Sequence, residues 1–317
     1  MDCRFQTSLI RQGTCSLTLH EPILVQRLYA AGCSTLVYQA SCGGREIVLR
    51  ELCPQGLSEQ GLLTRRTDGR LEIAGGRVPW VRWFRERKRF TRAVRLNLLM
   101  QRDPRLSRWV IPLEGMYRRN GTLYAPTRLP AGVPMMHIAG APAEVVLAAA
   151  ARILEMTEDI HRFGWLLVDI KASNYVLFPQ ADGRWELRLT DLDSAVPLSR
   201  LAEQKRFLCS NATAPPELLE GRAREAGPHS DVYSIAVMLL SALSGKPLQG
   251  NLRLLFREHA APALTHWQPQ SVQWLEELLL HALAPQPARR LPGCQAMLDG
   301  LAQICQKEAV DIESIFA

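Results

Sequence analysis

The chain has 317 residues, of which 47% are hydrophobic, and its formal net charge is +7 at pH 7. A chain of this size and composition can bury a large core, as one two-lobed domain or as two ordinary domains. No apolar run is long enough for a membrane span, and the N-terminus lacks the basic-then-apolar order of a secretory signal. The eight cysteines form no C-x-x-C pair and no metal-ligand spacing, so we expect free thiols, a cytoplasmic location and no zinc site.

The positive charge is concentrated in residues 82–95, which hold six arginines and one lysine. These side chains would lie around most of one predicted helix, and aromatic residues are not interleaved at a spacing suited to bases. The segment is therefore read either as a solvated helix face or as a docking surface for an acidic partner, and nucleic acid is an unlikely ligand.

The N-terminal third is predicted to be rich in strands. Residues 1–22 read as a lead-in, and a strand–turn–strand pattern follows over 24–40, with Gly32 in its turn. A further strand is expected over 45–52. Proline and several glycines in 53–80 indicate a loop that contains a small hairpin.

The middle of the chain changes from strands to helices. A helix is expected over about 81–100, and two strands are expected at 109–112 and 120–127. The strands would be joined at Asn120-Gly121, a strong hairpin turn. A second helix is predicted over 143–163, where apolar residues recur with helical spacing.

Residues 166–192 hold the most informative pattern, D-x-K-x-x-N, formed by Asp169, Lys171 and Asn174. An apolar strand follows Asn174, and a second strand after a polar turn ends at Asp191. Such a hairpin would bring Asp169, Asn174 and Asp191 to one edge. Hard divalent cations prefer oxygen ligands of this kind and share them with phosphates. The alternative is an acidic hairpin on the surface.

This pattern resembles the catalytic loop of the protein kinases and the metal-binding motif that follows it. The resemblance implies that Asp169 accepts the proton of the substrate hydroxyl and that Lys171 lies near the transferred phosphate. It also implies that Asn174 and Asp191 hold Mg²⁺ or Mn²⁺. Asp193 stands where the family has a glycine, and it would either ligate a metal or cap the next turn.

The same resemblance implies an ATP site in which the nucleotide-binding residues are Gly32, Val37, Arg50, Thr127, Leu129, Asn174 and Leu177. Gly32 is kept because a turn that covers phosphates with backbone N–H groups needs small residues and an unusual φ. Several positions depart from the family pattern. Arg50 replaces the phosphate-binding lysine, and Ala93 replaces the glutamate that pairs with it. Pro130 falls where a backbone N–H usually bonds adenine, unless the register differs by one residue. We expect the longer Arg50 to pair with Glu86 instead.

Further motifs extend the resemblance to the C-terminal region. Glu217, Asp231 and Arg290 occupy structural positions: Asp231 is implied to bond the catalytic-loop backbone, and Arg290 to be the buried partner of Glu217. His161-Arg162 mimics the family's H-R pair but lies too far upstream, and it is read as a helix end. Leu167-Val168 stands at the true position, so control by a phosphate-reading arginine is not expected.

The predicted fold is α+β, a bilobal protein-kinase fold with a small β-rich lobe over 23–130, including the 53–80 insertion, and a larger helical lobe over 131–317. The predicted function is ATP-dependent phosphoryl transfer to Ser/Thr of a protein substrate, because the D-x-K pattern resembles that branch. The alternative is a pseudokinase that binds a regulatory protein partner, favoured by Arg50, Ala93 and Pro130. A third possibility, a small-molecule kinase of related fold, is disfavoured by the C-terminal motifs.

Overall fold

The computed structural model describes residues 23–316 except 128, 130–131 and 139. The predicted lead-in and Pro130 lie outside the described residues. The chain divides into two compact units between Gly132 and Val133, the first rich in sheet and the second mainly helical. None of the described helices is long and apolar enough to cross a membrane.

A five-stranded antiparallel sheet forms the main body of the N-terminal unit. Its strands, in spatial order, are β1 (Ile23–Ala31), β2 (Thr35–Cys42), β3 (Arg45–Leu52), β7 (Thr122–Thr127) and β6 (Tyr117–Arg119). Side chains alternate between the two faces of a strand, and one face carries the fully buried Leu36, Tyr38, Leu49 and Tyr124. This apolar face is what fixes the register of the sheet.

The strand expected at 109–112 is wrong. Trp109 lies in a turn, Val110 is a single bridge residue, and Ile111 and Pro112 have no regular structure. An isolated bridge joins Leu113 to Thr127, and β6 is the strand that pairs with β7. Pro112 has no N–H for a ladder, which explains why the apolar run before it does not continue as a strand. The Asn120-Gly121 turn is present, and both residues have positive φ (51° and 73°), as a two-residue hairpin of this type requires.

One long helix and one insertion complete this unit. Helix α3 covers Arg77–Met100 and contacts β3; it begins four residues before the predicted start, with Pro79 in its first turn. The insertion consists of a short helix, α2 (Gln55–Ser58), and a hairpin of β4 (Leu63–Arg65) and β5 (Leu71–Ile73), so the expected small hairpin is confirmed.

A buried ion pair fixes this insertion to the sheet. Arg65 donates to Oε2 of Glu51 on β3 at 2.6 Å, and the Tyr38 hydroxyl donates to the same oxygen at 2.9 Å. The side chains of both charged residues are almost fully buried. Burial and the neighbouring Glu51 charge raise the pKa of Tyr38 far above its ordinary value, so its hydroxyl stays a donor.

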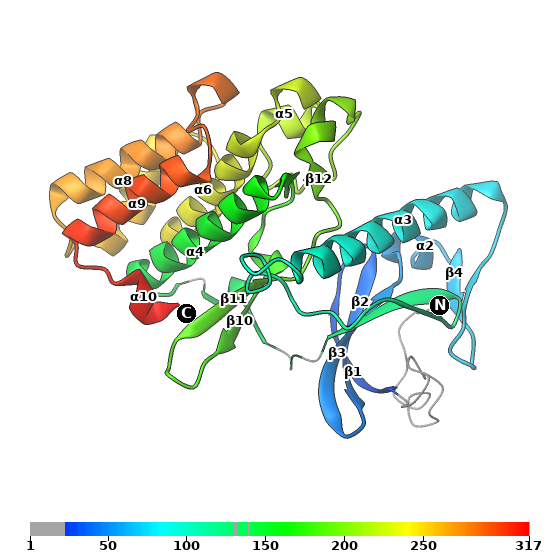
Figure 1. Ribbon diagram of the computed structural model, residues 1–317. Helices are drawn as coiled ribbons and strands as arrows, with labels where there is room; N and C mark the ends of the chain where they lie inside the picture. The colour runs from blue at the N-terminus through cyan, green and yellow to red at the C-terminus, as the bar shows by residue number, and fades with distance from the viewer. Residues whose placement is uncertain (1–22, 128, 130–131, 139, 317) are drawn as a thin grey trace. The chain divides into compact units, whose positions relative to one another are not determined.

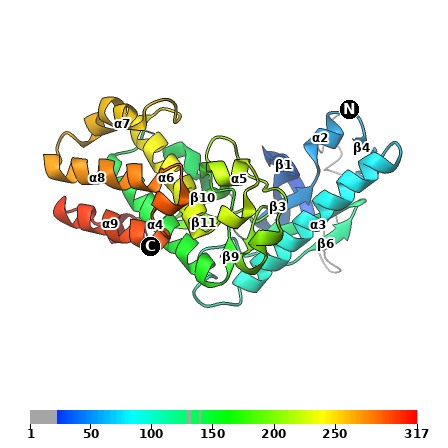
Figure 2. The ribbon, with the colours of Figure 1, turned by 90° about the horizontal axis from the view of Figure 1, so that it is seen from above.

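Four packed helices form the core of the C-terminal unit (Figures 1 and 2): α4 (Ala143–Arg162), α6 (Pro228–Ser244), α8 (Pro269–Ala282) and α9 (Cys294–Lys307). The helix predicted over 143–163 is therefore confirmed. Helix α6 is buried along most of its length, as a central helix must be. The short helices are α5 (Pro216–Leu219), α7 (Leu252–Leu255) and α10 (Ile312–Ile315).

Short strands beside these helices carry the predicted hairpin. Strands β10 (Tyr175–Pro179) and β11 (Trp185–Leu189) pair from Tyr175–Leu189 to Pro179–Trp185, and β8 (Val133–Pro134) adds to β10. A second small pair, β9 (Trp165–Leu166) with β12 (Val196–Pro197), lies before and after this hairpin in sequence. The β9–β12 pair joins the two ends of the segment that contains Asp169 and Asp191, and the β10–β11 pair lies within that segment.

Candidate active site

The backbone just before Asp169 is strained, and the side chain of Asp231 holds it in place. Val168 has φ of 73°, a left-handed conformation that costs a β-branched residue roughly 1–3 kcal/mol. The fully buried carboxylate of Asp231, on α6, accepts hydrogen bonds from the backbone N–H groups of Leu167 at 2.8 Å and Val168 at 2.9 Å. Two hydrogen bonds to a charged acceptor offset the strain, and they fix the orientation of the backbone that carries the Asp169 side chain.

His161 is a third partner of this carboxylate that the sequence interpretation missed. It does end α4, as expected, but its Nε2 lies 2.8 Å from Oδ2 of Asp231 in a buried contact. A signal was present in the sequence. His161 follows Ile160 and lies seven residues after Leu154, so it continues the apolar stripe that faces the core. A histidine on that face needs a polar partner, and the partner here is Asp231.

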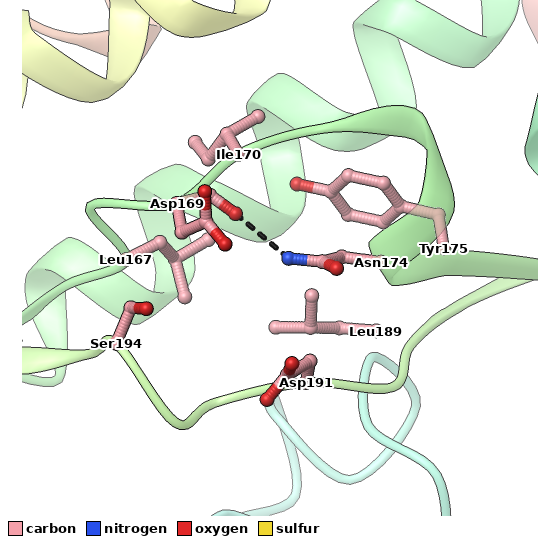
Figure 3. Close-up of a pocket in the computed structure, with 8 residues that line it drawn as sticks. All are labelled: Leu167, Asp169, Ile170, Asn174, Tyr175, Leu189, Asp191 and Ser194. Atoms are coloured by element: carbon pink, nitrogen blue, oxygen red, sulfur yellow. Dashed lines mark hydrogen bonds between the residues drawn. The ribbon is translucent and has the colours of Figure 1, made fainter. Parts of the chain in front are cut away.

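Asp169 lies at the edge of a small pocket in this unit (Figure 3). The Lys171 ammonium donates to Oδ2 of Asp169 at 2.6 Å, and the Asn174 amide donates to the Asp169 backbone carbonyl at 2.7 Å. The other carboxylate oxygen, Oδ1, is buried and has no hydrogen-bond partner among the described residues. A buried ionisable oxygen left without a donor is costly, which indicates that this atom is kept for a ligand.

Asn174 and Asp191 are brought together by the β10–β11 hairpin. Thr190 donates through both its backbone N–H (2.8 Å) and its hydroxyl (3.0 Å) to the Asn174 carbonyl. These bonds fix Asp191, the next residue, close to the catalytic loop. Oδ1 of Asp191 accepts from the backbone N–H of Asp193 at 2.9 Å, so Asp191 also shapes the turn that follows.

The pocket has the size and the donors that a divalent cation needs. Its volume is about 10 Å³, space for about one water-sized group. Its lining residues are Leu167, Asp169, Ile170, Asn174, Tyr175, Leu189, Asp191 and Ser194. The carboxylate and amide oxygens among them suit Mg²⁺, which prefers oxygen ligands and keeps some of its waters. The donor set therefore fits the predicted metal.

Val168 also anchors the segment that follows the hairpin. It packs in a buried apolar cluster with Leu166, Val196, Leu201, Ala214 and Leu218. A hydrophobic side chain thus stands where the family resemblance would have an arginine. The segment 196–218 is held against the catalytic loop by apolar burial, which needs no phosphate group.

Glu217 and Arg290 form a fully buried, bidentate ion pair. The Arg290 guanidinium donates to both Glu217 oxygens, at 2.7 Å and 3.2 Å, and the Ser230 hydroxyl donates to one of them at 2.8 Å. The remaining Arg290 donors reach backbone carbonyls, and its charge lies 4.8 Å from the Tyr233 ring centroid. Every charged atom has a partner, which is the condition for a stable buried pair.

The predicted nucleotide residues of the N-terminal unit lie on the sheet and in its loops. Val37 on β2 is the direct cross-strand partner of Arg50 on β3, so the two side chains share one face. Thr127 is buried at the end of β7, and its hydroxyl accepts from the Leu129 backbone at 3.3 Å. In the C-terminal unit, Leu177 is buried on β10.

One expectation about the turn between β1 and β2 is wrong. Gly32 was expected to be there because of an unusual φ, but its φ is not positive, and its N–H donates to the Thr35 carbonyl at 2.8 Å. A Cβ added to Gly32 would meet only Thr35, at 3.4 Å. The local backbone therefore does not require glycine at this position.

Arg50 lies beside an aromatic ring of α3. Its guanidinium lies 5.9 Å from the ring centroid of Phe90 on α3. Ala93, one turn further along α3, is buried and carries no charge to pair with it. Both oxygens of Glu86 are bound by other donors, Ser34 at 2.9 Å and Arg89 at 2.8 Å. A pair between Arg50 and Glu86 stays a prediction.

Comparisons with known proteins agree with this arrangement. Residues 107–301 match the protein kinase domain. Calcium-dependent protein kinase 17 of Arabidopsis thaliana is 26% identical over 198 residues, which are 59% of this chain and 37% of that protein. The chain thus matches well under half the length of this curated relative.

Two solved structures share the fold. PpkA-294 in its apo form has a TM-score of 0.62 at 20% identity, covering 88% of this chain and 95% of that one. The kinase domain of Mycobacterium tuberculosis PknI has a TM-score of 0.54 at 18% identity, covering 89% and 95%. The predicted α+β kinase fold is therefore confirmed. Since the family match spans more than half of the residues, the chain belongs to the protein kinase family.

Proposed function

We propose that this protein transfers the γ-phosphoryl group of ATP to a Ser or Thr hydroxyl of a protein substrate. The observation that carries the proposal is the state of Asp169. One of its oxygens is bound by Lys171, and the other is buried, without a hydrogen-bond partner among the residues that the structure describes. It lies at the edge of a pocket that also contains Asn174 and Asp191. Those are the groups that phosphoryl transfer needs, since it depends on positioning and on charge stabilisation.

In the proposed reaction the substrate hydroxyl approaches Oδ1 of Asp169. As the hydroxyl oxygen forms a bond to the γ-phosphorus, its proton passes to this carboxylate and the bond from the γ-phosphorus to the bridging oxygen breaks, releasing ADP. Lys171, beside Asp169, places positive charge where the transferred group becomes more negative. Asn174 and Asp191 would hold Mg²⁺ or Mn²⁺, which neutralises phosphate charge when bound.

The pattern Asp169-x-Lys171 supports the Ser/Thr branch of the family. The curated plant relative is named as a protein kinase, and a protein substrate is proposed here on the same basis. The cytoplasm is the proposed location, since the composition predicts free thiols.

A second candidate function is a pseudokinase that binds a regulatory protein and turns over ATP slowly or not at all. The observations that favour it are in the N-terminal unit. Arg50 stands in the lysine position and is near Phe90, and the position of its acidic partner is the buried Ala93. A planar guanidinium presents its donors differently from an ammonium, so phosphate would be held in a changed position.

Two measurements on the same variants separate these functions. The first is ³²P transfer from ATP, with Mg²⁺ or Mn²⁺, to the protein itself and to a generic Ser/Thr substrate. The second is the thermal shift caused by the same nucleotide and metal. We expect Asp169→Asn to lower transfer by about 10²- to 10⁴-fold, and to keep the thermal shift. The matched control is Asp299→Asn, an exposed aspartate on α9.

The results have distinct meanings. Transfer that depends on Asp169 supports the kinase. A nucleotide-dependent thermal shift with no transfer in the wild type supports the pseudokinase. Transfer that is the same in wild type and Asp169→Asn would disprove the catalytic role of this residue.

A further inference from the structure

A groove in the N-terminal unit has no part in the proposed reaction. It has a volume of about 380 Å³ and lies between the β4–β5 hairpin, the first half of α3 and the β6–β7 hairpin. Its lining residues are Leu63, Arg70, Leu71, Glu72, Ile73, Trp80, Trp83, Phe84, Arg87, Arg118, Gly121, Thr122 and Leu123. This volume falls within the range of about 300–1,000 Å³ found for ligand sites.

The wall formed by α3 exposes two large aromatic side chains. Trp80 is 44% exposed and Phe84 is 54% exposed, and their ring centroids are 6.0 Å apart. They are one turn apart on α3, so they form a continuous apolar strip beside the buried Trp83. Adjacent exposed aromatics at the edge of a hollow are typical of binding surfaces.

The rim of the groove is basic. Arg70, Arg87 and Arg118 come from three different elements, and none of them forms an ion pair with a residue that the structure describes. The single acidic lining residue, Glu72, is bound to Arg66 at 2.7 Å. Three guanidinium groups without acidic partners around one hollow attract a ligand that carries negative charge.

The groove is also rigid, which favours binding. The N–H of Leu71 donates to the Asn120 carbonyl at 2.8 Å and joins the two hairpins. Gly121 is needed at this junction because its φ is +73° and an added Cβ would lie 2.4 Å from the Leu71 carbonyl oxygen. The buried pair of Arg65 and Glu51 fixes β4 to the sheet. A preformed surface loses little conformational entropy when a ligand binds.

We infer that this groove binds a segment of a partner protein that presents a large apolar side chain between acidic residues. The apolar side chain would pack against Trp80 and Phe84, while the acidic residues would pair with the three arginines. This binding does not depend on phosphoryl transfer, so it can be tested in a variant that lacks activity. It also assigns one part of the basic segment 82–95, which includes Arg87, to a docking surface for an acidic partner, one of the two readings that the sequence left open.

The test uses fluorescence polarisation with three labelled peptides of nine residues. The first has a central Trp flanked by four Asp or Glu residues on each side, the second replaces the Trp by Ala, and the third replaces the acidic residues by Lys. We expect the first peptide to bind in the micromolar range and the other two to bind at least tenfold more weakly. Binding of the first should weaken as salt rises, because the arginines are solvent-accessible.

Variants locate the site. We expect Phe84→Ala and the double variant Arg87→Glu with Arg118→Glu each to weaken binding at least tenfold. The matched controls are Leu99→Ala and Arg95→Glu, which alter exposed residues of α3 outside the groove and should change binding less than twofold. Circular dichroism confirms that each variant is folded. Hydrogen exchange should show protection of β5 and of the first half of α3 by the first peptide.

Three outcomes would overturn the inference. The first is no binding of the acidic Trp peptide up to 1 mM. The second is equal loss with Arg95→Glu and with the double variant, which would indicate a diffuse basic helix surface. The third is stronger sedimentation with anionic lipid vesicles than with neutral ones, weakened equally by Arg95→Glu, which would assign this face to a membrane surface.

Discussion

The two units of this chain keep the protein kinase family pattern to different extents, and the reason is physical. In the C-terminal unit the residues near the reaction are joined to the core: Asp231 is fully buried, bonds the catalytic-loop backbone and also contacts His161. In the N-terminal unit the sheet is stabilised by its buried apolar face and by the ion pair of Glu51 with Arg65. A residue on the face that is predicted to meet the nucleotide can therefore change without cost to the fold.

The match to the protein kinase domain follows the same division. It covers residues 107–301, which include the whole catalytic loop but only the last part of the N-terminal unit. The departures Arg50 and Ala93 lie in the part that is not matched. In the C-terminal unit, the same residues stabilise the fold and position the catalytic loop. In the N-terminal unit, the residues that stabilise the fold are separate from those predicted to bind the nucleotide.

The largest effect should come from breaking the buried pair of the C-terminal unit. Arg290→Met leaves Glu217 charged, buried and without its main partner, so we expect a loss of about 3–5 kcal/mol in the free energy of unfolding. Urea denaturation followed by circular dichroism measures it. The matched control is Arg289→Met, which removes an exposed neighbouring arginine and should change stability by less than about 0.5 kcal/mol. A loss below 1 kcal/mol would contradict the view that this pair supports the frame.

The corresponding change in the N-terminal unit should cost less. Oε1 of Glu51 is buried without a partner among the described residues, so the native pair is already incompletely satisfied. We expect Glu51→Gln to cost about 1–3 kcal/mol by the same measurement. Glu59→Gln, an exposed change in the adjacent insertion, serves as control. A cost equal to or above that of Arg290→Met would remove the proposed difference between the two units.

A still smaller effect is expected at the nucleotide position itself. Arg50→Lys places a point charge where the family has one, and it should raise the rate of phosphoryl transfer roughly 3- to 10-fold with little change in stability. Steady-state kinetics with ATP checks this, with Arg45→Lys at the exposed end of the same strand as control. A fall in rate would mean that the guanidinium geometry, with Phe90 beside it, is itself used for catalysis.

The sequence predicted the catalytic loop well because its geometry is local. Asp169, Lys171 and Asn174 are within five residues of each other, and the hairpin that carries Asp191 has its register set by apolar alternation. The contact between Glu217 and Arg290 spans 73 residues and was available only through the family resemblance. Local pattern alone gives no information at that distance.

The failures have equally specific causes. The run W-V-I at 109–111 has strand propensity, but the turns before it and Pro112 after it limit it to a single bridge residue, Val110. The role of His161 was missed because its partner is 70 residues away on another helix. The contact of Arg50 with Phe90 was not predicted, since it depends on the packing of α3 on β3.

The pH dependence of stability gives the most specific test of the pair of Glu217 with Arg290. Burial alone would raise the pKa of Glu217, but hydrogen bonds from Arg290 and Ser230 outweigh burial and lower this pKa below its ordinary value of 4.5. A lowered folded-state pKa adds stability above pH 4.5, and this stability is lost as the pH falls through the folded pKa.

The stability difference between wild type and Glu217→Gln should therefore be largest near neutral pH and shrink below pH 4.5. Glu220→Gln, an exposed change three residues away, should show only a small difference throughout. A stability difference for Glu217→Gln that stays constant from pH 7 to pH 3 would mean that Arg290 does not stabilise the ionised carboxylate of Glu217. The C-terminal frame would then depend on apolar packing alone.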